Sequence, residues 1–288
     1  MSIEIIRFLQ DQSSLMLDLF FDGISFLGEE YFYIAVLGYI YWIVNKRFGE
    51  LLAIVLGFSL TLNNVIKDFT EANRPFEDYN DIENKRPETA TGHSMPSGHV
   101  QGSSSFFTAI ALYLKKHRYL IIAITLTILM MLSRMYLGVH YLKDVIVGAV
   151  IGISIAVVAH IFFQKYRHKP KQLHTVYIIL VLMFLPGLFI ITSNDFFKGY
   201  GILAGVVCAI IYEKRYVQFT YDISFVKKLL RYGVGLVLMG VILTSVKTLF
   251  MLIPSNDLLA NILDFVRYFF VAFIGFGVYP YLFKRWNF

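Results

Sequence analysis

The sequence has few charged residues and a single cysteine. Charged residues make up 16% of its 288 positions, whereas soluble domains average about 25%. With Cys208 alone, the chain cannot form an intrachain disulfide. We also find no low-complexity tract, no evident internal repeat and no cleavable signal peptide, because the first 22 residues carry Glu4, Asp11, Asp18 and Asp22 where a signal peptide is basic and then apolar. These absences exclude an ordinary soluble domain and a fold held by disulfides.

Hydrophobic residues are abundant instead, at 57% of the chain, and the mean hydropathy is +0.62. The net charge of +6 does not indicate a nucleic-acid partner, because the basic residues fall between apolar runs. Runs that approach the ~20 residues of a membrane span recur along the chain. The pattern predicts an all-α, polytopic transmembrane helical bundle with about nine spans. We place these spans at 27–45, 50–66, 99–114, 119–136, 144–163, 174–192, 199–213, 233–253 and 262–283.

Lysine and arginine predict the orientation of the bundle. If the N-terminus is extracytoplasmic, sixteen of the 26 basic residues fall in inner connections, and every inner connection is basic. The C-terminus is then cytoplasmic. Residues 1–26 carry acidic residues throughout, so we expect an amphipathic helix at the membrane interface. We therefore divide the chain into this interfacial helix (1–26), a five-span core (27–165) and a four-span extension (166–288).

Unusual polar residues gather at the outer ends of the predicted spans. The second span ends in NNVIKDFTEANRPF, the third opens with PSGH (96–99), and the fourth and fifth meet in SRMYLGVHYLKD (133–144). The long connection at 68–98 lies on the same side, and connections of that length are usually functional or disordered. Three distant segments thus deliver reactive residues to one membrane face.

The cations of these segments suit an oxyanion. Lys67, Arg74 and Arg134 have few compensating carboxylates at their own positions, and arginine forks match tetrahedral oxyanions. Ser97 and Gly98 stand at a helix start, where free N–H groups and the helix dipole attract an anion. The segments therefore predict a phosphate site.

Two histidines and an aspartate add reactivity. His140 and Asp144 are four residues apart, so they share a helix face if the fifth span begins there. A carboxylate on one ring nitrogen would leave the other lone pair for the substrate, while His99 could protonate a leaving oxygen. These three residues could instead bind zinc. Because the three cations would repel a metal ion, we expect no metal and no other cofactor.

At these residues the sequence resembles the type 2 phosphatidic acid phosphatase superfamily, or lipid phosphate phosphatases. KDFTEANRP (67–75), PSGH (96–99) and SRMYLGVHYLKD (133–144) match its three motifs at every defining position, and the resemblance covers about residues 27–165. It implies that His140 forms a phosphohistidine, that Asp144 orients it, and that His99 protonates the leaving group and then activates water. It further implies a metal-independent reaction in which the phosphate is bound by Lys67, Arg74, Ser97, Gly98 and Arg134.

The resemblance also implies a lipid phosphate or diphosphate substrate, met at the extracytoplasmic face. FLGEEYFYI (26–34) and Tyr41-Trp42 are similar to the sphingosine-phosphate and dolichyl-diphosphate branch, and nine spans with an outward N-terminus are similar to glucose-6-phosphatase. A site with three cations would accept any of several lipids: undecaprenyl diphosphate, phosphatidylglycerophosphate, phosphatidate or a sphingoid phosphate. The composition favours a bacterial plasma membrane, although an endoplasmic reticulum protein would have the same topology.

Some charges lie outside the motifs. Lys247 and Arg267 fall within apolar runs near the outer face, and such charges are functional candidates. They either snorkel or pair with Asp257 or Asp264, or they draw an anionic headgroup into a lateral substrate entrance. The carboxylates at 29 and 30 either pair with basic neighbours or gate the phosphate site.

The sequence thus predicts an integral membrane phosphatase whose partners are its lipid phosphate substrate and membrane lipids. We expect the last four spans to widen a lipid-facing cavity or to mediate self-association into a homo-oligomer. One alternative is a phosphatase of a soluble sugar phosphate. Another is a non-catalytic phospholipid-recognition or transport protein, which would need the cations but not the histidines. A vanadate-dependent haloperoxidase would use the same anion site, but that branch is typically soluble.

Overall fold

The described chain is almost entirely helical. The computed structural model describes residues 2–251, 253 and 256–286, and these residues form no strand. The predicted fold class, an all-α transmembrane bundle, is confirmed. The α-helices are α1 (Ser2–Asp11), α2 (Leu15–Phe26), α3 (Glu30–Tyr39), α4 (Lys46–Thr70), α5 (Pro75–Asp78), α6 (Gly98–Leu114), α7 (His117–Tyr136), α8 (Leu142–Tyr166), α9 (Pro170–Met183), α10 (Gly187–Ile190), α11 (Asn194–Tyr212), α12 (Phe225–Met251), α13 (Asp257–Phe273) and α14 (Tyr279–Arg285). Shorter turns of other helix types are η1 (Ile40–Val44), η2 (Pro87–Thr89), η3 (Glu213–Val217) and η4 (Ile274–Val278).

Seven stretches of the described chain are long and apolar enough to cross a membrane. They are Lys46–Asp78, His117–Tyr136, Leu142–Tyr166, Pro170–Ile190, Asn194–Val217, Phe225–Phe250 and Asp257–Phe283. The other two predicted spans, 27–45 and 99–114, correspond to the shorter apolar helix Glu30–Val44 and to α6, which has 17 residues. Nine spans and the orientation of the termini stay predictions. Residue 252, in the predicted eighth span, and residues 1, 287 and 288 lie outside the described residues.

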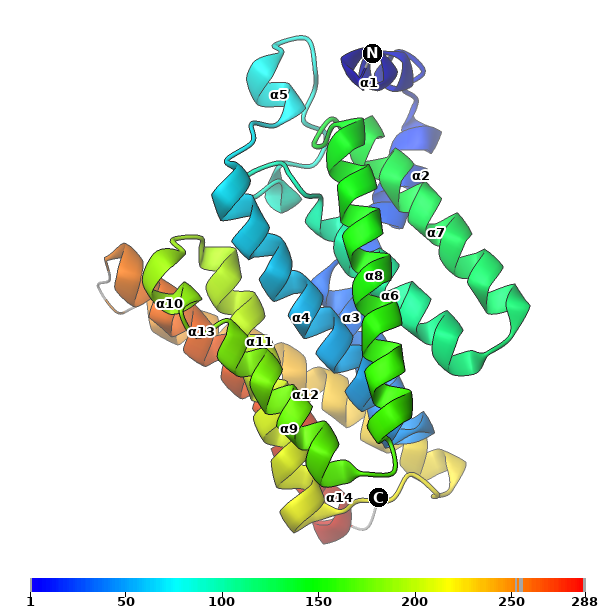
Figure 1. Cartoon of the computed structure of the whole chain (residues 1–288), viewed down its shortest axis with the longest axis vertical. Coiled ribbons are helices and arrows are strands. Elements are labelled where there is room, and N and C mark those ends of the chain that lie inside the picture. Colours follow the sequence, from blue (N-terminus) through cyan, green and yellow to red (C-terminus); the bar gives the residue numbers. More distant parts are fainter. Residues whose placement is uncertain (1, 252, 254–255, 287–288) are drawn as a thin grey trace. The chain divides into compact units, whose positions relative to one another are not determined.

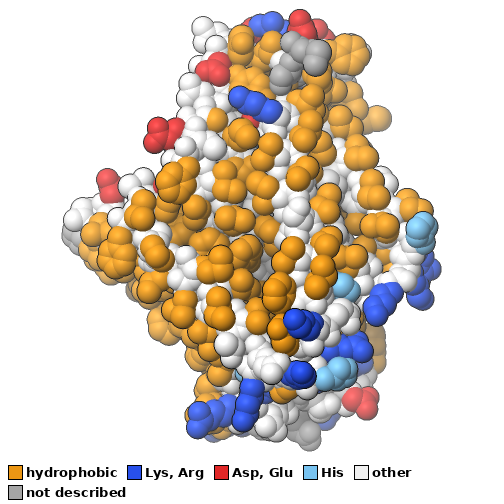
Figure 2. Space-filling view, in the orientation of Figure 1, with side chains coloured by type: hydrophobic (Ala, Val, Ile, Leu, Met, Phe, Trp, Pro, Cys, Tyr) orange, Lys and Arg blue, Asp and Glu red, His pale blue; other side chains and the backbone are white. Residues whose placement is uncertain are grey.

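Much of the described surface is apolar, as expected of a surface that faces lipid. Figure 2 shows hydrophobic side chains over most of the visible face. In the apolar window of α12, only 11% of the residues are buried, and in that of Pro170–Ile190 only 17% are. Such apolar exposure would be unfavourable in water, whereas lipid tails accommodate it.

The chain forms two compact units, each built from two stretches of sequence. Unit 1 consists of Met1–Tyr33 and Leu62–Ile161, and unit 2 of Ile34–Thr61 and Phe162–Phe288. The helices α3, α4 and α8 contribute residues to both units (Figure 1). The division predicted from the sequence, at residues 26 and 165, stays a prediction.

Within unit 1, α6 is a polar helix buried by its neighbours. Its first half contains Gln101 and three consecutive serines, all fully buried. The serine hydroxyls donate to carbonyls three residues earlier in the same helix, at 2.8–3.3 Å, which removes the cost of burying them. Helix α8 approaches closely because Gly148 and Gly152 face α6. A Cβ atom at Gly148 would lie 2.9 Å from the carbonyl oxygen of Ser97.

The N-terminal segment of unit 1 forms two helices where the sequence predicted one. Ser14 separates them, and its hydroxyl accepts a hydrogen bond from the N–H of Leu17 as the N-cap of α2. Ser133 of α7 donates to the carbonyl of Phe21 at 2.7 Å, which fixes α2 against α7. The interfacial location of this segment stays a prediction.

Unit 2 is centred on α11 and α13, which pack along each other (Figure 1). A Cβ atom at Gly201 of α11 would lie 2.5 Å from the carbonyl oxygen of Phe265 in α13, so only glycine permits this approach. Tyr41 and Trp42 of η1 join the unit by donating to the carbonyls of residues 276 and 275, at 3.0 and 2.9 Å.

Candidate active site

Lys67 and Arg74 of unit 1 reach the same backbone carbonyl. Lys67, near the end of α4, donates from Nζ to the oxygen of Thr91 at 3.3 Å, and Arg74 donates from Nη2 to that oxygen at 2.6 Å. Arg74 also donates to the carbonyls of Gly92 and Val139, at 3.0 Å each. Its side chain is 1% exposed. The guanidinium therefore ties the 74–92 loop to the residue that precedes the second motif histidine.

The N-terminus of α6 presents the PSGH motif. Ser97 is the N-cap residue, and its N–H donates to the carbonyl of Asp144 at 3.0 Å. Its hydroxyl is buried and has no hydrogen-bond partner among the described residues. A Cβ atom at Gly98 would lie 3.1 Å from Oδ1 of Asn63, so the glycine lets Asn63 pack closely against the start of α6. The first N–H groups of a helix have no intrahelical partner, and this end can therefore take an anion.

Ser94 lies between His140 and Asp144. Its hydroxyl donates to Oδ2 of Asp144 at 2.6 Å and lies 3.3 Å from Nδ1 of His140. The direct distance from Nδ1 to Oδ2 is 3.7 Å, and the N–H of Tyr141 donates to the same Oδ2 at 2.9 Å. Because α8 begins at Leu142, His140 precedes the helix and does not share a helical face with Asp144. At 3.7 Å the ring and the carboxylate do not form a direct hydrogen bond, so the hydroxyl of Ser94 links His140 to Asp144.

This arrangement selects one tautomer of His140. A hydroxyl has a single hydrogen, and Ser94 gives it to the carboxylate of Asp144. For a hydrogen bond with Ser94, Nδ1 of His140 must then be the donor. The other nitrogen, Nε2, consequently keeps its lone pair.

His99 and Arg134 extend the site towards α2. A Cβ atom at Gly28 would come within 2.8 Å of the ring of His99, so the two are in close contact. Nε2 of His99 is buried without a hydrogen-bond partner among the described residues. Arg134, at the end of α7, is fully buried and donates from Nη1 to Ser25 at 2.6 Å and to Thr89 at 3.4 Å.

Comparison with known proteins places this site in a family. Residues 49–168 match the PAP2 superfamily, and residues 197–288 match a family described as "PAP2 superfamily phosphatase, transmembrane extension". The chain is 30% identical over 158 residues to phosphatidylglycerophosphatase B of Bacillus subtilis, covering 50% of this chain and 74% of that protein. The chain belongs to the PAP2 superfamily. The resemblance inferred from the three motifs is confirmed, and the protein is a membrane phosphatase that hydrolyses phosphoric esters.

Two further relatives of this PAP2 phosphatase differ in length and source. Sphingosine-1-phosphate phosphatase 2 of Mus musculus is 25% identical over 131 residues, which is 43% of this chain but only 36% of that protein. The crystal structure of Aquifex aeolicus LpxE is 25% identical, and the match covers 55% of this chain and 93% of that chain with a TM-score of 0.50. All eight motif residues lie inside the PAP2 match: Lys67, Arg74, Ser97, Gly98, His99, Arg134, His140 and Asp144.

The cations of the PAP2 site act on His140. Burial, and then the positive charges of Arg74, Arg134 and Lys67, hold the pKa of His140 well below its usual range. The ring is therefore neutral at neutral pH. A neutral imidazole can use its lone pair, so the same cations that suit a phosphate keep the histidine in its nucleophilic form.

The sequence analysis missed two residues of the site. Ser94 stands two residues before the PSGH motif, where a loop serine is not distinctive. Arg86 is buried among carboxylates: it forms ion pairs with Asp22 and, at 2.5 Å, with Glu29. Of the two roles expected for the carboxylate at position 29, pairing with a basic neighbour is the one seen. The sequence did offer one signal for Arg86. It is a basic residue in a loop on the same predicted side as the acidic residues at a span entrance.

The residues predicted to form a lipid entrance lie in unit 2. Arg267 is buried, contacts Oδ1 of Asp264 at 3.0 Å, and stacks on Tyr268. Lys247 is exposed on α12. The expected pairing of Arg267 with Asp264 is therefore found, and the entrance role of Lys247 and Arg267 stays a prediction. The described residues contain no group of three or more His, Cys, Asp or Glu side chains arranged to hold a metal ion.

Proposed function

We propose that this PAP2 phosphatase hydrolyses a lipid phosphate or lipid diphosphate through a phosphohistidine formed on His140. The observation that carries the proposal is the position of Ser94 between His140 and Asp144. It leaves the lone pair on Nε2, the nitrogen that does not face the serine. Burial and the neighbouring cations keep that nitrogen unprotonated at neutral pH.

The reaction takes two displacements at phosphorus. In the first, Nε2 of His140 bonds to phosphorus, the bond to the leaving oxygen breaks, and His99 in its protonated form gives that oxygen a proton and becomes neutral. In the second, His99 takes a proton from water, the water oxygen bonds to phosphorus, and the phosphorus–nitrogen bond breaks to release inorganic phosphate. Water is the only second substrate. The unpartnered Nε2 of His99 supports this proton-transfer role.

Five residues bind the phosphate in this proposal. Lys67, Arg74 and Arg134 neutralise its charge, Ser97 contributes its hydroxyl, and the N-terminus of α6 donates N–H groups that begin with that of Gly98. The buried hydroxyl of Ser97 supports the assignment, because it has no hydrogen-bond partner among the described residues. Fixed donors that face developing charge are a large source of transition-state stabilisation.

A lipid substrate is supported by the relatives phosphatidylglycerophosphatase B and sphingosine-1-phosphate phosphatase 2, whose names specify lipid phosphates. The basic inner connections of the sequence support an active site on the extracytoplasmic face. The composition favours a bacterial plasma membrane as its location. Lys247 and Arg267 would then attract the headgroup from the outer leaflet.

The test is phosphate release by the purified protein in the presence of EDTA. The panel contains undecaprenyl diphosphate, phosphatidylglycerophosphate, phosphatidate, a sphingoid phosphate and glucose 6-phosphate. We expect release from a lipid, reduced about a thousandfold or more in His140→Ala, and a phosphoenzyme that is labile to acid and stable to base. Full activity of His140→Ala would refute the phosphohistidine. Preference for glucose 6-phosphate would favour the sugar-phosphate alternative, and lipid binding without release would favour the recognition module.

A further inference from the structure

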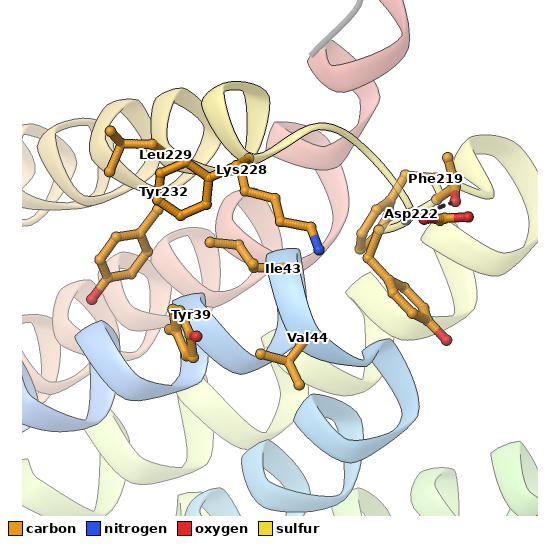
Figure 3. A pocket seen from close by; sticks show the side chains of 11 residues that line it. Tyr39, Ile43, Val44, Phe219, Asp222, Lys228, Leu229 and Tyr232 are labelled. Carbon is orange, nitrogen blue, oxygen red and sulfur yellow. Dashed lines mark hydrogen bonds between the residues drawn. The ribbon is translucent and has the colours of Figure 1, made fainter.

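A large cavity of unit 2 lies where α12 begins. Its volume is about 960 Å³, within the range of small-molecule sites. Three segments line it: the Tyr39–Val44 turn, the Phe219–Asp222 segment after η3, and the first two turns of α12 (Figure 3). None of the eight motif residues is among those that line it. The candidate active site therefore does not account for this cavity.

Aromatic rings form a fixed wall of the cavity. Tyr39 and Tyr232 meet edge to face with ring centroids 5.8 Å apart, and the hydroxyl of Tyr232 donates to the carbonyl of Ala35 at 3.2 Å. On the rim, Phe225 and Leu229 of α12 are 78% and 61% exposed. The rim continues along the apolar exposed surface of α12, which is a candidate membrane span. The apolar rim of the cavity is therefore continuous with a surface that we expect to lie against lipid.

Lys228 brings a charge into this apolar setting. Its amine points into the space beside Ile43 and Val44, while the carboxylate of Asp222 points away from it (Figure 3). Lys228 is half-buried, and no described residue accepts a hydrogen bond from its amine or forms an ion pair with it. A half-buried ammonium without an acceptor is best stabilised by an anion.

Other cations of this region are already engaged. Arg231, one turn further along α12, is 2% exposed and donates to the carbonyls of Trp42 and Thr220, at 3.1 and 2.8 Å. Lys46 lies 2.7 Å from the carboxylate of Glu213. Because Glu213 forms an ion pair with Lys46, it does not neutralise the charge of Lys228 in the cavity. The charge at the cavity is thus that of Lys228, with exposed Asp222 directed outwards.

We propose that this cavity binds an acidic phospholipid of the surrounding bilayer. Its phosphate contacts the amine of Lys228, its glycerol region lies against Tyr39 and Tyr232, and its acyl chains follow the rim formed by Phe225 and Leu229. Tyrosine and lysine at the end of a membrane helix are the residue types that meet headgroups, and basic segments next to membrane helices attract anionic lipids. The lipid is held here as a ligand and is not hydrolysed, because no motif residue lines the cavity.

The experiment measures lipid binding by the full-length protein in nanodiscs of phosphatidylcholine. A fluorescent phosphatidylglycerol is titrated against wild type, Lys228→Gln, Lys228→Arg and the matched control Lys227→Gln, which removes the same charge one residue away from the lining. We expect Lys228→Gln to weaken binding about fivefold, the contribution of one lysine near an anionic lipid, while Lys228→Arg and Lys227→Gln stay within about twofold. Gel filtration and thermal melting establish that each variant is folded.

Three outcomes would overturn the proposal. Wild type could show no preference for phosphatidylglycerol over phosphatidylcholine, or Lys227→Gln could weaken binding as much as Lys228→Gln, which would indicate general surface charge. Inorganic phosphate could displace the lipid at equal concentration, which would make the site one for a free anion. Because binding is read without turnover, these outcomes are independent of the phosphatase reaction proposed above.

Discussion

The hydroxyl of Ser94 donates a 2.6 Å hydrogen bond to the carboxylate of Asp144. Ser94 is therefore expected to position the proposed nucleophile without touching the substrate. A hydrogen bond to a charged group is worth about 1.5–3 kcal/mol, so Ser94→Ala should lower kcat about 10- to 100-fold and leave KM nearly unchanged. Ser94→Thr, which keeps the hydroxyl, should restore most of the activity. Steady-state kinetics on the preferred lipid measures both.

The matched control is Ser103→Ala. Ser103 is equally buried, but its hydroxyl donates to the carbonyl of Val100 in its own helix at 3.3 Å. Its loss should change kcat less than about twofold, because no partner outside α6 is involved. Equal effects of the two substitutions would show that Ser94 acts through general packing and not through Asp144.

The pH dependence of His140 follows from its lowered pKa. Protonation removes the lone pair on Nε2, so reactivity falls as the pH drops through the pKa of His140. Because burial and the cations lower that pKa, the fall should occur below pH ~6.5, the value of an unperturbed histidine. Carbethoxylation by diethyl pyrocarbonate, which modifies the neutral ring, separates this titration from that of the substrate.

The rate of that carbethoxylation is compared between wild type and His140→Ala across the acidic range. The difference between the two curves isolates His140 and should titrate below the unperturbed value. A midpoint above it would mean that burial and the three motif cations do not lower the pKa of His140 as the structure requires.

Arg74 should stabilise the loop as well as bind phosphate. Arg74→Gln removes the fork that serves the carbonyls of Thr91, Gly92 and Val139, and each buried carbonyl left unpaired costs about 1–3 kcal/mol. A loss of about 2 kcal/mol or more of stability should lower the melting temperature by several degrees. Limited proteolysis should then cleave within 79–92.

Arg7→Gln provides the comparison for Arg74. Arg7 pairs with Asp81 at 2.7 Å, but the side chains are 43% and 55% exposed. Exposed ion pairs contribute about 0–1 kcal/mol, so this variant should melt within about two degrees of wild type. If both arginine variants melted alike, the carbonyl contacts of Arg74 would not be holding the loop.

Close approach of α8 to α6 should make Gly148 intolerant of any side chain. In Gly148→Val the Cβ atom would lie 2.9 Å from the carbonyl oxygen of Ser97, which would displace the N-cap of α6 and with it the phosphate site. We expect loss of most activity and a lowered melting temperature. A Cβ atom at Gly233 of α12 would have no neighbour within 4 Å, so Gly233→Ala should instead be neutral or stabilise the fold by up to about 1 kcal/mol. An active, stable Gly148→Val protein would contradict the packing.

The predicted lipid entrance can be tested at Lys247. Lys247→Leu should raise KM for a lipid phosphate and leave KM for a small soluble phosphate ester unchanged, because only the lipid arrives from the bilayer. Arg267→Leu is a poorer probe, since it would leave the partly buried carboxylate of Asp264 without its partner. An equal rise in KM for both substrates would refute the entrance role of Lys247.

The sequence was sufficient for the fold class and for the family, because hydrophobic runs and motif spacing are local signals. It was weaker for α6, whose composition combines an apolar second half with Gln101 and three serines. A hydropathy pattern does not reveal that those polar groups are satisfied within the helix and enclosed by neighbours. Ser94 was missed for a related reason: its role depends on the three-dimensional position of Asp144, fifty residues later in the sequence.

Arg86 shows the same limit for charges. Its partners Asp22 and Glu29 lie more than fifty residues earlier in the chain, in segments assigned to an interfacial helix and a span entrance. Helical spacing finds pairs three or four residues apart, but long-range ion pairs require the fold. The α1–α2 break at Ser14 was equally hidden, because a single serine within an amphipathic pattern is common.

The enclosure of α6 bears on how the protein is made. A helix of 17 residues that contains Gln101, Ser103, Ser104 and Ser105 is a weak signal for insertion into a bilayer by itself. It gains its environment from α7 and from the glycine face of α8, both of which are synthesised later. We therefore expect α6 to enter the membrane only together with those helices. Chains truncated before Gly148 should leave it accessible to a protease during biogenesis.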